Sequence, residues 1–109
     1  MDLQQKHCVP CDGSAPPLGA AGEQDLLARL KGWRLDRSGI HKLAKSFEFS
    51  GFRGAMAFAE KVAQIAEREG HHPDIHIYYR KVHVEVYTHA ILGLSENDFI
   101  VAAKIDAVA

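Results

Sequence analysis

The sequence predicts an α+β fold, a two-layer sandwich in which helices cover one face of a four-stranded antiparallel sheet. Three segments have apolar residues at the helical spacing of three and four, and two pairs of short strand-like segments lie between them. The resulting order is α-β-β-α-β-β-α. Strands that follow each other in pairs form hairpins, which gives an antiparallel sheet with the helices on one side.

The chain divides into a tail and a body. Residues 1–22 are rich in proline, glycine and alanine and show no hydrophobic period, which predicts a poorly ordered N-terminal extension. Residues 23–109 form the predicted domain, which is large enough for a hydrophobic core. We therefore expect that removal of residues 1–20 leaves activity almost unchanged.

The first half of the body contains one helix and two strands. The helix begins near Glu23 and ends before Gly32, and its apolar positions are Leu26, Leu27 and Leu30. The segment 33–49 then predicts two short strands joined by the turn "DRSG". One face of the second strand carries Leu43, Phe47 and Phe49.

The clearest helix follows, in the segment "GFRGAMAFAEKVAQIAEREG". Its apolar residues recur every three or four positions, as in a helix, and Gly70 suits the position just past the helix end. The expected apolar face consists of Phe52, Ala55, Met56, Ala59, Val62, Ala63 and Ala66.

The last part predicts a hairpin and a helix. Residues 74–79 and 82–89 alternate as strands around a tight turn at Arg80 and Lys81, although the turn lacks the usual Gly or Asn. His89 would stand at the end of the second strand. Ser95 with Asp98 three residues later resembles a capping box, so a helix should begin there.

Composition excludes several classes of function. The formal charge is −1, so no basic surface would attract nucleic acid or an anionic membrane. The chain has no apolar stretch long enough to cross a bilayer and no targeting segment, which makes the cytoplasm the default location. The remaining partners are small molecules or other proteins.

Imidazoles and carboxylates gather at three predicted segment ends. His71 and His72 follow the long helix, His89 ends a strand, and Glu67 and Asp98 lie in helical end turns. A rigid scaffold can hold a solvent-open site at such positions. Each histidine taken alone is more often a solvated side chain, and Asp98 has a structural explanation as a helix cap.

Metal and redox sites are weaker alternatives. The run "HHPDIH" holds three histidines and Asp74, but adjacent histidines before a proline are poorly placed to bind one ion together. Cys8 and Cys11 form a single CxxC, which could be half of a zinc site or a redox pair. Without a second such motif, an unliganded tail is the favoured interpretation.

The whole constellation resembles the pterin-4a-carbinolamine dehydratase family. The pattern is Glu67, then "HHP" at 71–73, Tyr79, His89 and Asp98, and the likeness extends to "LKGW" and "KVHVEVYTHAILGLSENDF". It covers roughly residues 23–109. The tail "KHCVPCDGSAP" is of the kind found in bacterial members, and Gly70 departs from the acidic residue of animal ones.

The resemblance implies a function and roles for residues. The family removes water from 4a-hydroxytetrahydropterin to give quinonoid dihydropterin, with neither metal nor redox cofactor, by acid–base catalysis in a recycling pathway that serves an aromatic amino acid hydroxylase. The implied catalytic residues are His71, His72 and His89. His71 and His89 would be the acid and base, and His72 would bind the pterin and polarise its hydroxyl. Glu67 would orient His71. The implied walls of the substrate slot are Pro73, Thr88, Asp98 and Trp33.

The resemblance also implies assembly and a second class of function. Family members form homodimers and homotetramers, and we expect the hairpin edge and the helix "DFIVAAKIDAVA" to supply the surfaces. Some animal members act instead as dimerisation cofactors of a homeodomain transcription factor. The bacterial-type tail favours the dehydratase over this protein-binding alternative.

Overall fold

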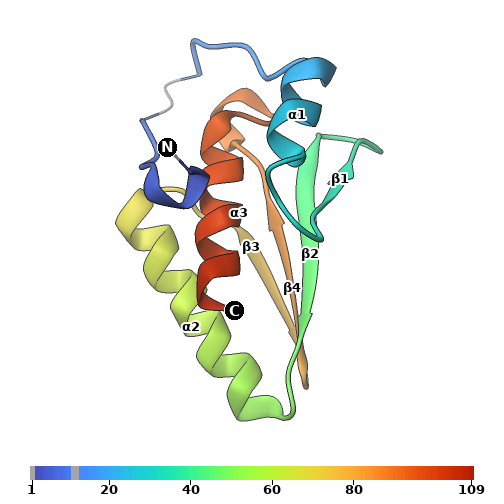
Figure 1. Cartoon of the computed structure of the whole chain (residues 1–109), viewed down its shortest axis with the longest axis vertical. Coiled ribbons are helices and arrows are strands. Elements are labelled where there is room, and N and C mark those ends of the chain that lie inside the picture. The colour runs from blue at the N-terminus through green and yellow to red at the C-terminus, as the bar shows by residue number, and fades with distance from the viewer. Residues whose placement is uncertain (1, 11–12) are drawn as a thin grey trace.

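The fold is an open four-stranded sheet with helices on one side. The computed structural model describes residues 2–10 and 13–109. Its elements are η1 (Leu3–Gln5), α1 (Ala20–Leu27), β1 (Arg34–Asp36), β2 (Lys42–Glu48), α2 (Phe52–Glu69), β3 (Asp74–Tyr78), β4 (Lys81–Val86), η2 (His89–Ile91) and α3 (Glu96–Val108). The sheet has the order β1-β2-β4-β3 with every pair antiparallel, which confirms the predicted fold class (Figure 1).

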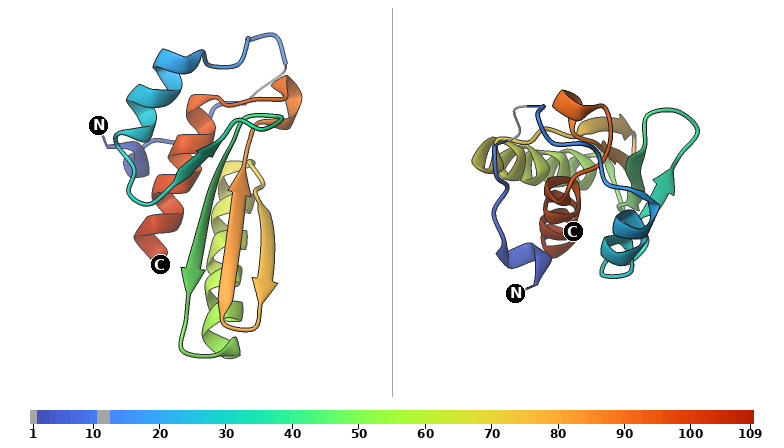
Figure 2. Two further views of the ribbon diagram at one scale, coloured as in Figure 1. Left: turned by 90° about the vertical axis from the view of Figure 1, so that its right-hand side faces the viewer. Right: turned by 90° about the horizontal axis from the view of Figure 1, so that it is seen from above.

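The core lies between the sheet and the helices. Figures 1 and 2 show α2 and α3 on the same side of the sheet. Along β4 the alternate residues Val82, Val84 and Val86 are buried beneath them, whereas His83 and Glu85 point to the opposite face. That opposite face carries no helix in the described part of the chain.

Helix α2 ends as the sequence indicates but turns a somewhat different face to the core. Gly70 has φ 66° and caps the helix in the left-handed conformation, which glycine adopts without strain. The buried residues are Ala55, Phe58, Val62, Ile65 and Ala66. The expected members Phe52 and Met56 are exposed instead, because the buried stripe of the helix runs through Ala55, Phe58 and Val62 and leaves them on its outer side.

The hairpin turn lies one residue earlier than expected. Tyr78 pairs with Lys81, so the turn residues are Tyr79 and Arg80, and Tyr79 takes a positive φ of 51° in place of a glycine. The strand β4 also ends sooner, at Val86. His89 is therefore not a strand residue but the first residue of the short helix η2.

The start of α3 confirms the capping box. The backbone amide of Ser95 donates to Asp98 Oδ2 at 2.8 Å, which satisfies a donor at the helix start. The helix is buried along much of its length, including Phe99, Ile100, Val101 and Ile105. The expectation that α3 offers an apolar surface for assembly is therefore wrong, because η1, α2 and the sheet already cover its apolar residues.

The N-terminal segment differs most from expectation. Helix α1 begins at Ala20 rather than near residue 23, and Leu3 is only 5% exposed within the hydrophobic core. Residues 3–10 run along α3 and reach the end of α2 (Figure 1). This segment was expected to be poorly ordered because it has no hydrophobic period, and the contacts that hold Cys8 and Val9 join them to residues more than sixty positions away.

Candidate functional site

A pocket of about 390 Å³ opens where four segments meet. These are the end of α2, the end of β4 with η2, the start of α3, and the N-terminal segment. The pocket is lined by Cys8, Val9, Pro10, Glu69, Gly70, His71, His72, Tyr87, Thr88, His89, Ala90 and Asn97. The three histidines that sequence analysis singled out, His71, His72 and His89, therefore share one cavity.

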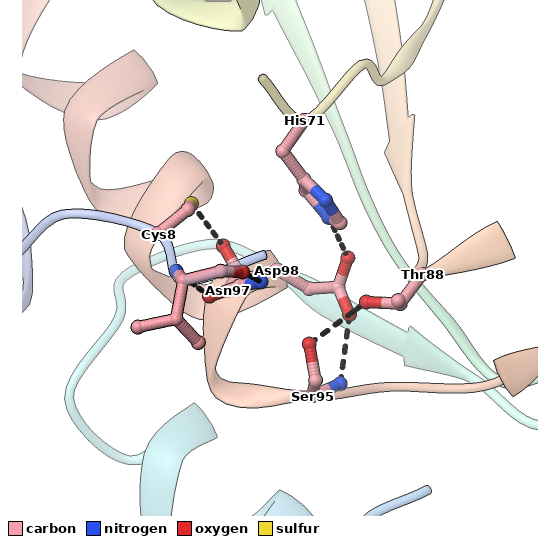
Figure 3. Close-up of polar contacts among 7 residues, drawn as sticks. Cys8, His71, Thr88, Ser95, Asn97 and Asp98 are labelled. Atoms are coloured by element: carbon pink, nitrogen blue, oxygen red, sulfur yellow. Dashed lines mark hydrogen bonds and ion pairs between the residues drawn. The ribbon is translucent and has the colours of Figure 1, made fainter. Parts of the chain in front are cut away.

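His71 is held from behind by Asp98. Its Nε2 lies 2.6 Å from Asp98 Oδ1, and the Asp98 side chain is fully buried (Figure 3). A buried carboxylate binds the N–H of an imidazole, so the proton belongs on Nε2 and the lone pair on Nδ1. The last turn of α2 fixes the backbone, because the His71 amide donates to the Ala66 carbonyl.

The second carboxylate oxygen of Asp98 accepts hydrogen bonds from Thr88 and from the Ser95 backbone. Thr88 Oγ1 donates to Asp98 Oδ2 at 2.8 Å, and the Ser95 amide donates to the same oxygen. Since the Thr88 proton is used in this way, the Ser95 hydroxyl donates to Thr88 Oγ1, 2.8 Å away. The carboxylate of Asp98 therefore caps helix α3 and also holds the imidazole of His71.

Glu67 does not orient His71. Its carboxylate instead pairs with His72 Nε2, and both side chains are largely exposed. The prediction placed Glu67 beside His71 because four residues separate them, but the left-handed residue Gly70 turns the chain out of the helix between them. Asp98 takes the place that Glu67 was expected to fill.

His89 lines the cavity from η2. Its ring stacks on Tyr87 with centroids 4.4 Å apart, and the residue is exposed. Thr88, between them, lines the pocket as expected. Pro73 is not among the lining residues; it directly follows His72 and precedes β3.

Trp33 lies away from this site. It is buried in the core, packs edge-on against Phe47, and donates from Nε1 to Asp106 at 3.0 Å. Asp106 follows Asp98 by eight residues of α3, or about 12 Å along the helix. Trp33 was expected to brace the substrate slot, but the structure places it near the far end of α3.

Several lining residues had no signal in the sequence. Tyr87 was assigned to a strand face, Glu69 and Asn97 attracted no attention, and Cys8 to Pro10 were assigned to the tail. Glu69 and Asn97 are neighbours of the recognised residues Gly70 and Asp98, which is the one local clue. The tail reaches the site only through contacts across more than sixty residues of sequence.

The described residues contain no metal-binding cluster and no membrane-spanning helix. Among residues 2–10 and 13–109, no three His, Cys, Asp or Glu side chains form a group that could hold a metal ion. Cys11, the second cysteine of the CxxC, lies outside the described residues. No helix in the described part combines the length and apolar character needed to cross a membrane.

One known protein family matches most of the chain. The family described as pterin 4 alpha carbinolamine dehydratase matches residues 16–108. The chain belongs to this dehydratase family. The match includes every element from α1 to α3 and all three pocket histidines.

Bacterial relatives of the dehydratase family match nearly the whole chain. A protein of Methylococcus capsulatus is 47% identical over 107 residues, covering 98% of this chain and 93% of its own length. One from Nitrosospira multiformis is 49% identical, covering 98% and 92%. Both carry the pterin-4-alpha-carbinolamine dehydratase name. Because the alignments cover almost the entire chain, these relatives match parts of the N-terminal segment as well.

Solved structures share the dehydratase fold. A transcriptional coactivator/pterin dehydratase from Brucella melitensis superposes with a TM-score of 0.80 at 31% identity, covering 85% of this chain and 98% of that one. A pterin dehydratase-like RuBisCO assembly factor of the alpha-carboxysome gives a TM-score of 0.62 at 26% identity, covering 72% and 89%. The fold is thus found in proteins described by different functions.

Proposed function

We propose that this protein dehydrates 4a-hydroxytetrahydropterin to quinonoid dihydropterin and water. The observation that carries the proposal is the His71–Asp98 pair at the edge of a cavity that also contains His72 and His89. Membership of the dehydratase family supports it, as do the names of the bacterial relatives.

The reaction requires two proton transfers and no change of oxidation state. The bond between C4a and its hydroxyl breaks, a proton is delivered to the departing oxygen, and the proton on the adjacent ring nitrogen is removed. The nitrogen lone pair supplies the electrons for the new double bond. Imidazole has an unperturbed pKa of about 6.5 and can serve as either acid or base near neutral pH.

His71 is the better candidate for the base. The negative charge of Asp98 stabilises the imidazolium that forms when Nδ1 takes a proton, as in other carboxylate–histidine pairs. His89 then serves as the acid, from an exposed position in the lining of the same cavity. Two histidines with different surroundings suit a reaction that needs one donor and one acceptor.

His72 and Glu67 would bind the substrate. The side chain of His72 lines the pocket and pairs with Glu67, which is not itself a lining residue. The polar edge of a pterin carries several donors and acceptors that could replace Glu67 as the partner of His72. Thr88 would shape the cavity floor, since its hydroxyl is already committed to Asp98. The physiological role would be to restore a pterin cofactor after use by an aromatic amino acid hydroxylase.

The test uses freshly generated 4a-hydroxytetrahydropterin. The purified protein should accelerate its dehydration in the presence of a chelator, because the proposed chemistry uses only side chains. A rate equal to that of buffer would contradict the proposal. So would a rate that disappears with chelator and returns with added zinc.

A protein-binding function is the second candidate. One solved relative is described as a coactivator and another as an assembly factor, and this chain exposes Phe52 and Met56 together on the outer face of α2. Phe52 and Met56 lie in the first turns of α2, whereas His71 and His72 follow the opposite end of this 18-residue helix. Both functions can therefore be tested on one protein by changing either surface alone.

A further inference from the structure

We propose that residues 7–10, termed the N-terminal strap, form a substrate-contacting wall of the pocket and raise its affinity for the flat pterin ring. This inference rests on the proposed function for the class of ligand. It assigns a binding role to a segment outside the sequence pattern that identifies the site. It replaces the expectation that removal of residues 1–20 leaves activity almost unchanged, because that deletion would remove lining residues of the pocket.

Glu69 anchors the first half of the strap. Its side chain is 2% exposed, and its two oxygens accept from the Cys8 amide at 2.8 Å and from His7 at 3.0 Å. Burial alone would raise the pKa of Glu69, but these hydrogen bonds and the charge of Lys104 outweigh it and lower the pKa. The anchor therefore stays ionised at neutral pH.

Asn97 anchors the second half. Its Oδ1 accepts from the Val9 amide at 3.0 Å, and its Nδ2 donates to the Val9 carbonyl at 2.7 Å. This pair of bonds imitates the pairing of a strand and fixes the direction of the backbone. Asn97 precedes Asp98, so the first turn of α3 holds the strap with one residue and His71 with the next (Figure 3).

The following described residues are held on the η2 side of the pocket. Gly13 has φ 84°, and a Cβ there would lie 3.1 Å from the Ala90 carbonyl oxygen. A Cβ on Gly93 would lie 2.7 Å from Pro17, so only glycine allows this approach. The segment is thus fixed beside both α3 and the helix that carries His89.

The strap presents an uncharged surface to the pocket. Val9 is 69% exposed and Pro10 is exposed beside it, and both line the cavity. Burial and the nearby charge of Glu69 raise the pKa of the Cys8 thiol to about 12, so it remains neutral. Val9 exposes apolar surface to water in the free protein. The face of a bound pterin ring would cover this surface, and removal of apolar surface from water favours binding.

The experiment compares Val9→Ser with the matched control Ile40→Ser. Both replace an exposed branched side chain, but Ile40 lies in the loop between β1 and β2. For Val9→Ser we expect KM to rise roughly 5- to 10-fold with kcat nearly unchanged, because a contact made equally to substrate and transition state affects binding alone. The dissociation constant of biopterin, followed by its fluorescence, should rise by a similar factor. The control should change neither.

Release of the strap is tested separately with Asn97→Ala. In a Cys11→Ser background, Cys8 is the single thiol, and its alkylation by iodoacetamide should be faster after Asn97→Ala and slower when biopterin is bound. The inference is overturned if Val9→Ser leaves both KM and biopterin affinity unchanged, or if biopterin gives no protection. A wild-type protein that binds biopterin through Val9 but does not dehydrate the carbinolamine would refute the proposed function and leave the strap's role intact.

Discussion

Asp98 links His71 to the N-terminus of α3: its Oδ1 lies 2.6 Å from His71 Nε2, while its Oδ2 caps the helix through the Ser95 amide. The imidazole is therefore held by the same group that fixes where the helix begins. A rigid element behind a catalytic side chain keeps that side chain in position without further cost during the reaction.

Asp98→Asn should lower kcat by roughly 10²-fold or more while the protein remains folded. The new amide would place N–H groups toward His71 Nε2 and force the imidazole proton onto Nδ1, which removes the proposed base. The measurement is turnover of the carbinolamine together with circular dichroism. The control is Asp106→Asn on the same helix, which should alter stability but not kcat.

The histidines should separate by role. Replacing either His71 or His89 with Ala should reduce turnover by roughly 10²-fold, the scale for losing one general acid or base. The double variant should cost less than the two effects combined, since water can replace one partner. His83→Ala, on the open face of the sheet, is the control and should be nearly neutral. A folded double variant with wild-type turnover would show that neither residue is catalytic.

Trp33→Phe should affect stability and leave substrate binding unchanged. The change removes the hydrogen bond from Nε1 to Asp106 within a partly buried contact that also includes Lys45, which is worth about 1–2 kcal/mol. Denaturant unfolding would measure the loss. A higher KM without a loss of stability would restore the earlier expectation that Trp33 braces the substrate slot.

Cys8 should react slowly and with a distinctive dependence on pH. Its pKa is raised to about 12, from an ordinary value of 9.0, chiefly by burial and also by Glu69. At pH 8 the folded Cys11→Ser protein should therefore alkylate roughly 10³-fold more slowly than the same protein in urea. The raised pKa favours folding below pH 9, and this contribution is lost as the pH rises through 12. Equal rates in the two states would mean that the thiol is not enclosed.

Assembly should depend on α2 rather than on α3. We expect an oligomer, a homodimer or homotetramer, because Phe52 and Met56 expose an apolar surface and β3 is an unpaired sheet edge. Met56→Lys should reduce the molar mass measured by light scattering at micromolar concentration, with turnover largely retained. Lys61→Ala, elsewhere on the exposed surface of α2, serves as the control. A wild-type monomer would contradict this prediction.

The positions of several helices and strands could be predicted from the sequence alone. Helical periodicity and Gly70 located α2, alternating valines located β4, and Ser95 with Asp98 located the start of α3. These features depend on residues close together in the chain, and hydrogen bonding and burial within one element are enough to fix them. The three pocket histidines stand at or near predicted segment ends, but their selection depended on the resemblance to the family pattern and not on local physics.

Only the tertiary structure decided which partners meet at the site. It paired His71 with Asp98 instead of Glu67, removed Trp33 from the pocket, and brought residues 8–10 into its wall. A hydrogen bond between Val9 and Asn97 joins positions 88 apart in sequence and leaves no periodic trace at either one. Such contacts depend on how whole elements pack, which is why the composition of the tail predicted disorder while its backbone is bound to α3.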